Sequence, residues 1–362
     1  MNTLGHKLRV TVFGQSHAPA IGCVVEGLPA GFIPDMDRLA AFLARRAPGR
    51  TAWSTPRQES DAPEILSGLV EGRTCGAPVC AVIRNGDQRS RDYEGLRRTP
   101  RPSHADYTAW VKYGESYDIR GGGQFSGRLT APLCFAGALA LQLLEERGVT
   151  VAAHIGQIGG VYDEAPDFAA VDRETLTALL ARPFPAFRED AGVAMRQEIE
   201  RARMDADSVG GLVRCFAVGL PAGVGEPMFE GVENRLAGAL FGIPAVRGVS
   251  FGEGFAAAGM RGSEHNDPFY FDEEGRVRTR ANRHGGVLGG ITSGMPLLVR
   301  AAFKPTPSIA QEQDTVNLET GQNATLSIHG RHDPCIVPRA AAAVEAAACV
   351  ASLELLAESG LL

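Results

Sequence analysis

The chain has 362 residues, of which 44% are hydrophobic and 22% are charged, and its net charge at pH 7 is −6. This balance is typical of a globular protein and excludes a disordered chain, and the negative charge disfavours a general nucleic-acid binder. No signal peptide and no run of about 18 apolar residues is present, so we expect a cytoplasmic protein without a membrane span.

Seven cysteines are scattered from Cys23 to Cys349. The count is odd and no C-x-x-C pair occurs, which argues against a disulfide framework and against a zinc site. The eight histidines show no metal-ligand spacing either. We therefore expect reduced cysteines in the core of a cytosolic protein, and no bound metal.

In the first part of the chain, residues 7–13 alternate and are rich in β-branched residues, which predicts a strand. A second strand is expected over 21–26 and a short buried strand over 79–83. A helix begins near Pro34-Asp35 and runs to about Arg46. Residues 85–127 show little periodicity and much Arg, Gly and Asp, so we interpret them as a functional loop region.

The second part begins with a mostly apolar helix over 130–147, followed by a strand over 149–158. The closing apolar stretch contains Glu345 and Glu354, so we interpret it as a buried helix. Strands occur in pairs or singly between helices, which favours an α+β fold in one continuous domain, residues 1–362. The remaining predictions are helices over 172–181, 190–204, 229–241 and 338–356 and strands over 212–218 and 294–303.

The charge is unevenly distributed along the chain. Residues 45–128 hold thirteen Arg and one Lys against ten Asp and Glu, a local charge of +4 within a chain of −6. An arginine-rich segment in an acidic protein suits a small anionic ligand, because arginine binds phosphate and carboxylate with a planar, two-pronged group. A solvated face with many ion pairs is the alternative.

Two histidines lie in segments that could carry proton chemistry. His17 follows Gln15 and Ser16 in a turn at the end of the first strand, where it could act as an acid or base or have a structural role. In Arg101-Pro102-Ser103-His104-Ala105-Asp106-Tyr107, the arginine could hold an anion while His104 moves a proton. The alternative is a helix N-cap at Ser103.

Two further segments could contact anions. Three glycines in Arg120-Gly121-Gly122-Gly123-Gln124-Phe125-Ser126-Gly127-Arg128 precede a helix, which would bring backbone N–H groups near a phosphate. The segment matches neither a Walker loop nor the dinucleotide fingerprint. The run Gly330-Arg331-His332-Asp333-Pro334-Cys335 suits an active-site corner, or else a solvated turn with an N-cap aspartate. No Ser–His–Asp spacing is recognisable.

Taken together, these segments resemble the chorismate synthase family. The resemblance covers essentially the whole chain in order. Its motifs lie at residues 14–17, 45–49, 54–61, 85–90, 101–107, 121–128, 285–290, 304–306 and 330–335.

The resemblance implies a single-domain β-α-β sandwich with internal pseudo-symmetry, usually assembled as a homotetramer. It implies anti-1,4-elimination of phosphate and a proton from 5-enolpyruvylshikimate 3-phosphate to give chorismate, the last common step of aromatic amino acid biosynthesis. Members require reduced FMN, which lends electron density to the substrate and then recovers it.

The resemblance also implies roles for individual residues. His17 would protonate the departing phosphate, His104 would keep reduced flavin in its protonation state, and Asp333 would act at the flavin N5. Substrate would be held by Ser16, Arg45, Arg101, Ser126, Arg128 and Arg331. Flavin contacts would come from Gln124, Phe125, Ser126, Ala245, Gly289, Lys304, Pro305, Thr306, Pro307, Ser308 and Arg331.

Some positions depart from the family pattern, namely Gln15, Ala18, Gln124, Phe125, Pro244 and Ala52. Ala52 replaces an arginine linked to nicotinamide binding, so any NADP contact would fall to Arg46 or Arg50. The family contains members that reduce their own flavin and members that receive it reduced. We expect this chain to depend on an external flavin reductase, with NADPH acting only indirectly. Competing interpretations are an FMN-binding oxidoreductase or electron carrier, an anion- or nucleic-acid-binding protein, and an inactive relative.

Overall fold

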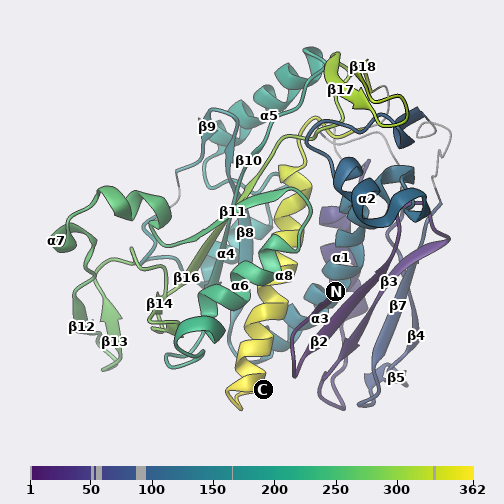
Figure 1. Ribbon diagram of the computed structural model, residues 1–362. Helices are drawn as coiled ribbons and strands as arrows, with labels where there is room; N and C mark the ends of the chain where they lie inside the picture. Colours follow the sequence, from purple (N-terminus) through teal and green to yellow (C-terminus); the bar gives the residue numbers. More distant parts are fainter. Residues whose placement is uncertain (1, 50–52, 54–58, 87–94, 165, 329–331) are drawn as a thin grey trace.

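The computed structural model describes residues 2–49, 53, 59–86, 95–164, 166–328 and 332–362. Two antiparallel five-stranded sheets enclose a layer of helices (Figure 1). The first sheet has the order β1 (Thr3–Leu4), β2 (Arg9–Gly14), β3 (Ala20–Glu26), β7 (Val79–Arg84), β4 (Pro63–Ser67). The second has the order β11 (Val246–Phe251), β16 (Leu297–Phe303), β10 (Gly211–Val218), β8 (Thr150–Ile158), β9 (Val161–Tyr162).

The helices form two groups. The inner layer consists of α1 (Met36–Arg46), α3 (Thr130–Glu146), α6 (Val232–Phe241) and α8 (Val337–Glu358). Outside it lie α2 (Asp106–Tyr113), α4 (Arg173–Leu180), α5 (Glu189–Met204) and α7 (Gly262–His265), and α4 packs on β8. Short hairpins complete the fold: β5 (Leu69–Val70) with β6 (Arg73–Thr74), β12 (Phe269–Phe271) with β13 (Val277–Thr279), β14 (Val287–Leu288) with β15 (Ile291–Thr292), and β17 (Gln313–Asn317) with β18 (Gln322–Leu326).

The two halves of the chain repeat one arrangement. In the first half, β2, β3, α1, β4, β7 and α3 follow in sequence, and the strands lie in the order β2-β3-β7-β4. In the second half, β8, β10, α6, β11, β16 and α8 follow in sequence, and the strands lie in the order β8-β10-β16-β11. Both sheets therefore share one topology, with equivalent helices after the second and fourth strands. The expected β-α-β sandwich with internal pseudo-symmetry is confirmed.

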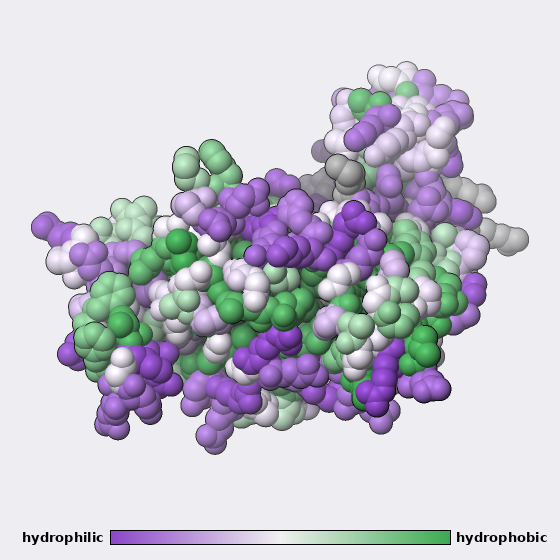
Figure 2. All heavy atoms as spheres, turned by 90° about the horizontal axis from the view of Figure 1, so that it is seen from below, coloured by the Kyte–Doolittle hydropathy of each residue, from purple (hydrophilic) through white to green (hydrophobic). Residues whose placement is uncertain are grey.

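The equivalent helices α3 and α8 cross closely in the core. A Cβ added to Gly137 would lie 2.3 Å from the Cβ of Ala346, so only glycine permits this approach. Both helices are long and apolar enough to cross a membrane by composition, but 78% and 100% of their apolar windows are buried in the fold. They are core helices, as expected for the closing stretch. Figure 2, seen from below, shows hydrophobic residues across the middle of this face and hydrophilic residues along its edges.

Local sequence signals explain several element boundaries. Asp35 caps α1 by accepting from the N–H of Arg38 at 3.0 Å, and Asp172 caps α4 by accepting from Thr175 at 2.8 Å. The predicted strands and long helices are present within a few residues. The prediction of a loop region over 85–127 was wrong in part, because α2 and the 3-10 helices η3 (Arg120–Phe125) and η4 (Gly127–Leu129) lie there.

Candidate active site

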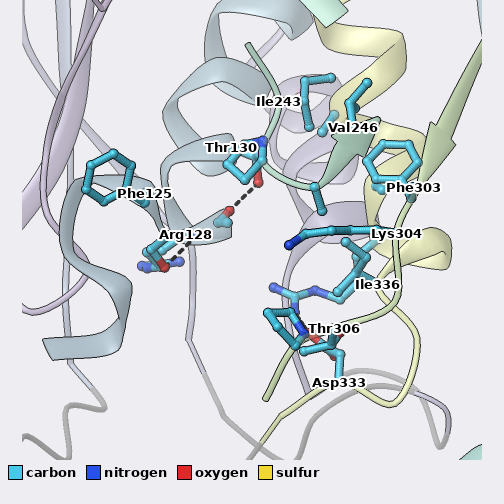
Figure 3. A pocket seen from close by; sticks show the side chains of 18 of the residues that line it. Phe125, Arg128, Thr130, Ile243, Val246, Phe303, Lys304, Thr306, Asp333 and Ile336 are labelled. Carbon is cyan, nitrogen blue, oxygen red and sulfur yellow. Dashed lines mark hydrogen bonds and ion pairs between the residues drawn. The ribbon is translucent and has the colours of Figure 1, made fainter. Parts of the chain in front are cut away.

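A cavity of about 560 Å³ opens at one end of the helix layer, within the range of small-molecule sites. Its lining comes from both halves of the chain: the segment before α3, the connection from α6 to β11, the end of β16, and the turn before α8 (Figure 3). The pseudo-symmetric fold thus brings together segments that are far apart in sequence.

One part of the lining is apolar. Ile243, Val246, Phe303 and Ile336 line the cavity together (Figure 3). The hydroxyl of Thr306 lies among the lining residues and has no hydrogen-bond partner in the described part of the chain. An apolar surface with an unsatisfied buried donor is typical of a ligand site.

Among the residues that the structure describes, five cationic side chains line the same space: Arg46, Arg101, Arg128, Lys304 and Arg339. Burial lowers the pKa of Arg128 and of Arg339, and burial together with the charge of Arg247 lowers the pKa of Lys304. Arg46, Arg101 and Arg128 are buried, and Lys304 and Arg339 are half-buried. Such a concentration of cations strongly favours an anionic ligand.

Arg46 and Arg128 share one buried carboxylate. Arg46 donates through Nη1 to Oδ2 of Asp61 at 2.7 Å, and Arg128 donates through Nη1 to Oδ1 of the same residue. Arg128 also donates through Nε to Asn85 at 3.1 Å. Burial opposes ionisation of Asp61, but the charges of Arg46 and Arg128 outweigh it and lower its pKa.

The segment 101–107 forms a second compact network. Arg101 binds Asp106 with two prongs, through Nε at 2.7 Å and Nη2 at 2.8 Å. Nδ1 of His104 lies 2.6 Å from Oδ1 of Asp106. Nη2 of Arg101 also lies 3.1 Å from this Nδ1. Because the contact with Asp106 is the shorter one and a carboxylate can only accept, we assign the imidazole proton to Nδ1, which leaves Nε2 as a base. A Cβ on Gly122 would lie 3.4 Å from that Nε2, so the glycine leaves this atom open.

The titration of this pair follows from burial and hydrogen bonding. Burial, which Asp106 only partly offsets, lowers the pKa of His104 from its ordinary 6.5, and the charge of Arg101 acts in the same direction. Burial opposes ionisation of Asp106, but hydrogen bonds from Arg101 and His104 prevail and lower its pKa. His104 is therefore a neutral base near neutral pH, beside a permanently ionised carboxylate.

Ser103 does not cap a helix, as one interpretation allowed. Its φ is +57°, and α2 starts at Asp106 after Ala105 without a side-chain cap. Instead, the backbone carbonyl of Ser103 accepts a hydrogen bond from Nζ of Lys304, and Nη1 of Arg101 lies 3.3 Å from the hydroxyl of Ser308. These contacts join the 101–107 segment to the 304–308 segment.

His17 and Ser16 lie behind the glycine loop rather than on the cavity lining. Both are buried, and a Cβ on Gly121 would lie 2.5 Å from Oγ of Ser16 and 2.9 Å from Nε2 of His17. Gly121 itself lines the cavity. Oγ of Ser16 has no hydrogen-bond partner within the described residues.

The three glycines do not lie directly at the start of α3, where they were expected. All three have positive φ, and the N–H of Gly122 donates to the carbonyl of Ile119 at 2.9 Å. The carbonyl of Gly123 accepts from the N–H of Ser16 at 3.1 Å, and α3 begins only at Thr130. The glycines serve the close approach of Ser16, His17 and His104.

Asp333 lines the cavity and accepts from Nη1 of Arg339 at 2.5 Å. It is not an N-cap, because α8 begins at Val337 after Ile336. The other lining residues among those predicted are His104, Gln124, Phe125, Ser126, Ala245, Thr306, Pro307 and Ser308. Ala245 has a φ of +74°, and its carbonyl accepts from the N–H of Lys304 at 3.0 Å.

Besides Ser16 and His17, three predicted positions within the described part of the chain do not line the cavity. Arg45 does not, because its guanidinium forms a two-pronged pair with the buried Glu345 of α8, at 2.7 Å for each contact. Gly289 lies in the β14–β15 turn, and Pro305 is also absent from the lining. Arg331 and Arg50 lie outside the described residues, as does Ala52.

Sequence reasoning missed Asp61, Asn85, Asp106 and Arg339 as site residues. The first three lie inside motifs already recognised, at 54–61, 85–90 and 101–107. Their place in these motifs could have identified them, because polar residues that orient arginines often lie in the same short segments of the sequence as the arginines.

Comparisons with known proteins agree with this geometry. A family model for chorismate synthase matches residues 8–356. A chorismate synthase of Thermococcus gammatolerans is 51% identical over 343 residues, covering 94% of each chain. One from Korarchaeum cryptofilum is 48% identical, covering 94% of this chain and 93% of its own. A crystal structure of chorismate synthase superposes with a TM-score of 0.77 at 26% identity, covering 98% of this chain and 93% of the other. The chain therefore belongs to the chorismate synthase family and is a carbon–oxygen lyase.

Proposed function

We propose that the cavity binds 5-enolpyruvylshikimate 3-phosphate beside reduced FMN and eliminates phosphate and a ring proton to give chorismate. The observation that carries the proposal is the mixed lining, in which five cations and an apolar wall border one space. The substrate has a phosphate and two carboxylates, and a flavin ring is flat and largely apolar. Each part of the lining suits one of them.

The cationic groups are proposed to hold the substrate. Arg46, Arg101, Arg128 and Arg339 provide planar donors for phosphate and carboxylate oxygens, and Ser126 adds a hydroxyl. Phosphate is a good leaving group only when its growing charge is stabilised, and one preorganised donor is typically worth about 3 kcal/mol. Arg331 remains a predicted substrate and flavin contact from its motif.

The apolar wall, Lys304 and the unsatisfied hydroxyl of Thr306 fit reduced FMN, which supplies electron density to the substrate as phosphate leaves. The residues proposed to hold it are Gln124, Ser126, Ala245, Lys304, Thr306, Pro307 and Ser308. Pro305 and Gly289 do not line the cavity of the single chain, so their assignment as flavin contacts has less support.

Proton handling is proposed to rest on three residues. Nε2 of His104 is an available base whose tautomer is fixed by Asp106 at 2.6 Å. Nε2 of His17 lies beside Gly121, which lines the cavity and has no side chain. We therefore propose that His17 protonates the departing phosphate across this glycine. Asp333 assists abstraction of the ring proton, and its pairing with Arg339 orients its carboxylate.

The wider setting is also a proposal. We expect a cytoplasmic homotetramer that receives reduced flavin from a separate reductase. An NADP contact through Arg46 is disfavoured, because this cavity-lining guanidinium is proposed to hold the substrate instead. An FMN-dependent oxidoreductase or electron carrier is also disfavoured, since it would not need five cations around its flavin.

The test is anaerobic incubation of the purified protein with 5-enolpyruvylshikimate 3-phosphate and chemically reduced FMN, following chorismate and phosphate together. Equal release of both products is expected. NADPH and FMN alone should give little turnover until a flavin reductase is added. Folded, FMN-binding protein that releases neither product would contradict the proposal.

A further inference from the structure

We propose that Asp61 is a positioning residue, which fixes the guanidinium groups of Arg46 and Arg128 for the anionic substrate. The inference rests on the proposed function, because it assumes that these two arginines hold the substrate. Asp61 is 1% exposed and does not itself line the cavity. It therefore acts through the two arginines that do.

The carboxylate of Asp61 joins two distant parts of the chain. Its Oδ2 accepts from Arg46, the last residue of α1, and its Oδ1 accepts from Arg128, in η4 just before α3. Two guanidinium groups held this close repel each other. One buried carboxylate with an oxygen for each lets both stay at the cavity.

The remaining partners complete the orientation without using all the donors. Arg46 donates to Thr130 at 3.0 Å and to the carbonyl of Gly127 at 2.9 Å, and Arg128 donates to Asn85 at 3.1 Å and reaches Glu59 at 3.4 Å. With Asp61, these contacts use three of the five N–H groups that each guanidinium carries. The other two on each can serve a phosphate or carboxylate.

The backbone of Asp61 supports a functional role. Its φ is +49°, in the left-handed region that is unfavourable for a non-glycine residue, although Asp and Asn tolerate it better than most. Such conformations cluster at sites where a side chain must be held in one direction. Here that direction places both carboxylate oxygens against arginines.

A rival role makes the opposite prediction. If Asp61 only neutralised the arginines and competed with the substrate, its removal would strengthen anion binding. If it positions them, Asp61→Asn should weaken binding, because an amide accepts from one arginine and turns its own N–H groups toward the other. The sign of the change in substrate affinity therefore separates the two roles.

The experiment measures the substrate dissociation constant by calorimetry with oxidised FMN present, and KM and kcat with reduced FMN, for Asp61→Asn and Asp61→Gly. Glycine adopts a φ of +49° without strain, so it removes the carboxylate with little backbone cost. We expect the dissociation constant and KM to rise at least about tenfold, with a smaller change in kcat and unchanged FMN affinity.

Asp163→Asn is the matched control. Asp163 is 1% exposed and accepts from the N–H of Phe187 at 2.6 Å and of Arg188 at 3.1 Å, away from the cavity lining. It should lose stability and keep the wild-type KM. Unchanged or tighter substrate binding in folded Asp61 variants would overturn the inference, and so would unfolding of both at a temperature where Asp163→Asn is folded. Absence of turnover in the wild type would instead refute the proposed function.

Discussion

Arg45 and Arg46 are adjacent on the last turn of α1, yet their guanidinium groups serve different parts of the protein. Arg45 pairs with Glu345 of α8 inside the helix layer, with both contacts at 2.7 Å, whereas Arg46 lines the cavity and binds Asp61 at 2.7 Å. One residue along a helix turns the side chain by about 100°. The same dipeptide therefore joins core packing to ligand binding.

Substitution of the two arginines should separate these effects. Arg46→Gln should raise the KM for 5-enolpyruvylshikimate 3-phosphate by about tenfold or more, because it removes a charged donor from the cavity. Arg45→Gln should leave KM near wild type but destabilise the fold by about 3 kcal/mol, because the buried carboxylate of Glu345 loses its cation. Steady-state kinetics and urea unfolding of both variants make the comparison. A large KM effect of Arg45→Gln with unchanged stability would contradict it.

The pH dependence should follow His104. Its folded pKa lies below the ordinary 6.5, so Nε2 remains a base down to that lower value and activity should fall only on the acid side of 6.5. The unfolded chain takes up a proton near 6.5 first, so the stability contributed by neutral His104 is lost as the pH decreases from 6.5 through the folded pKa.

His104→Asn tests this assignment, since an amide can still donate to Asp106 but has no counterpart of Nε2. We expect kcat to fall at least about tenfold and the acid limb of the profile governed by this group to disappear, while FMN still binds. A variant that retained both the rate and the acid limb would exclude His104 from proton handling.

The glycine loop predicts a steric effect. Gly121→Ala would place a Cβ 2.5 Å from Oγ of Ser16 and 2.9 Å from Nε2 of His17, at a φ of +61° that disfavours alanine. Both side chains must move, so we expect turnover to fall at least about tenfold. Gly160→Ala is the control, because its Cβ would meet nothing within 4 Å. Equal activity of the two variants would show that the positions of Ser16 and His17 do not matter.

The sequence predicted the long elements well because their signals are local. Asp35 and Asp172 mark helix starts, and the apolar run that became α3 shows its burial directly. β11 was missed because a glycine at 248 and a register shift beside it interrupt the strand pattern. The helix α2 was missed because it is short and buries only Asp106 and Ala109.

The site was harder to predict than the fold, because which side chain enters a cavity depends on contacts between distant segments. Arg45 and Arg46 have the same chemistry and belong to one motif, and only the positions of Glu345 and Asp61 distinguish them. Similarly, the role of Asp106 as the partner of both Arg101 and His104 requires a turn that composition does not specify. Motifs located the segments, whereas packing decided the directions of the side chains.

Phe125 departs from the family pattern, and its packing predicts a structural role. It lines the cavity but also packs on the buried cluster of Leu96, Ala109, Tyr117 and Ile119, on the far side from Phe303 (Figure 3). Phe125→Leu should keep FMN affinity within about twofold, because leucine preserves most of the apolar contact. Phe125→Ala should cost about 2 kcal/mol of stability and weaken FMN binding, since the glycine loop loses its anchor. Flavin fluorescence titration and thermal unfolding measure both effects. Equal loss of FMN affinity in the two variants, with stability unchanged, would instead assign the ring of Phe125 to direct flavin contact.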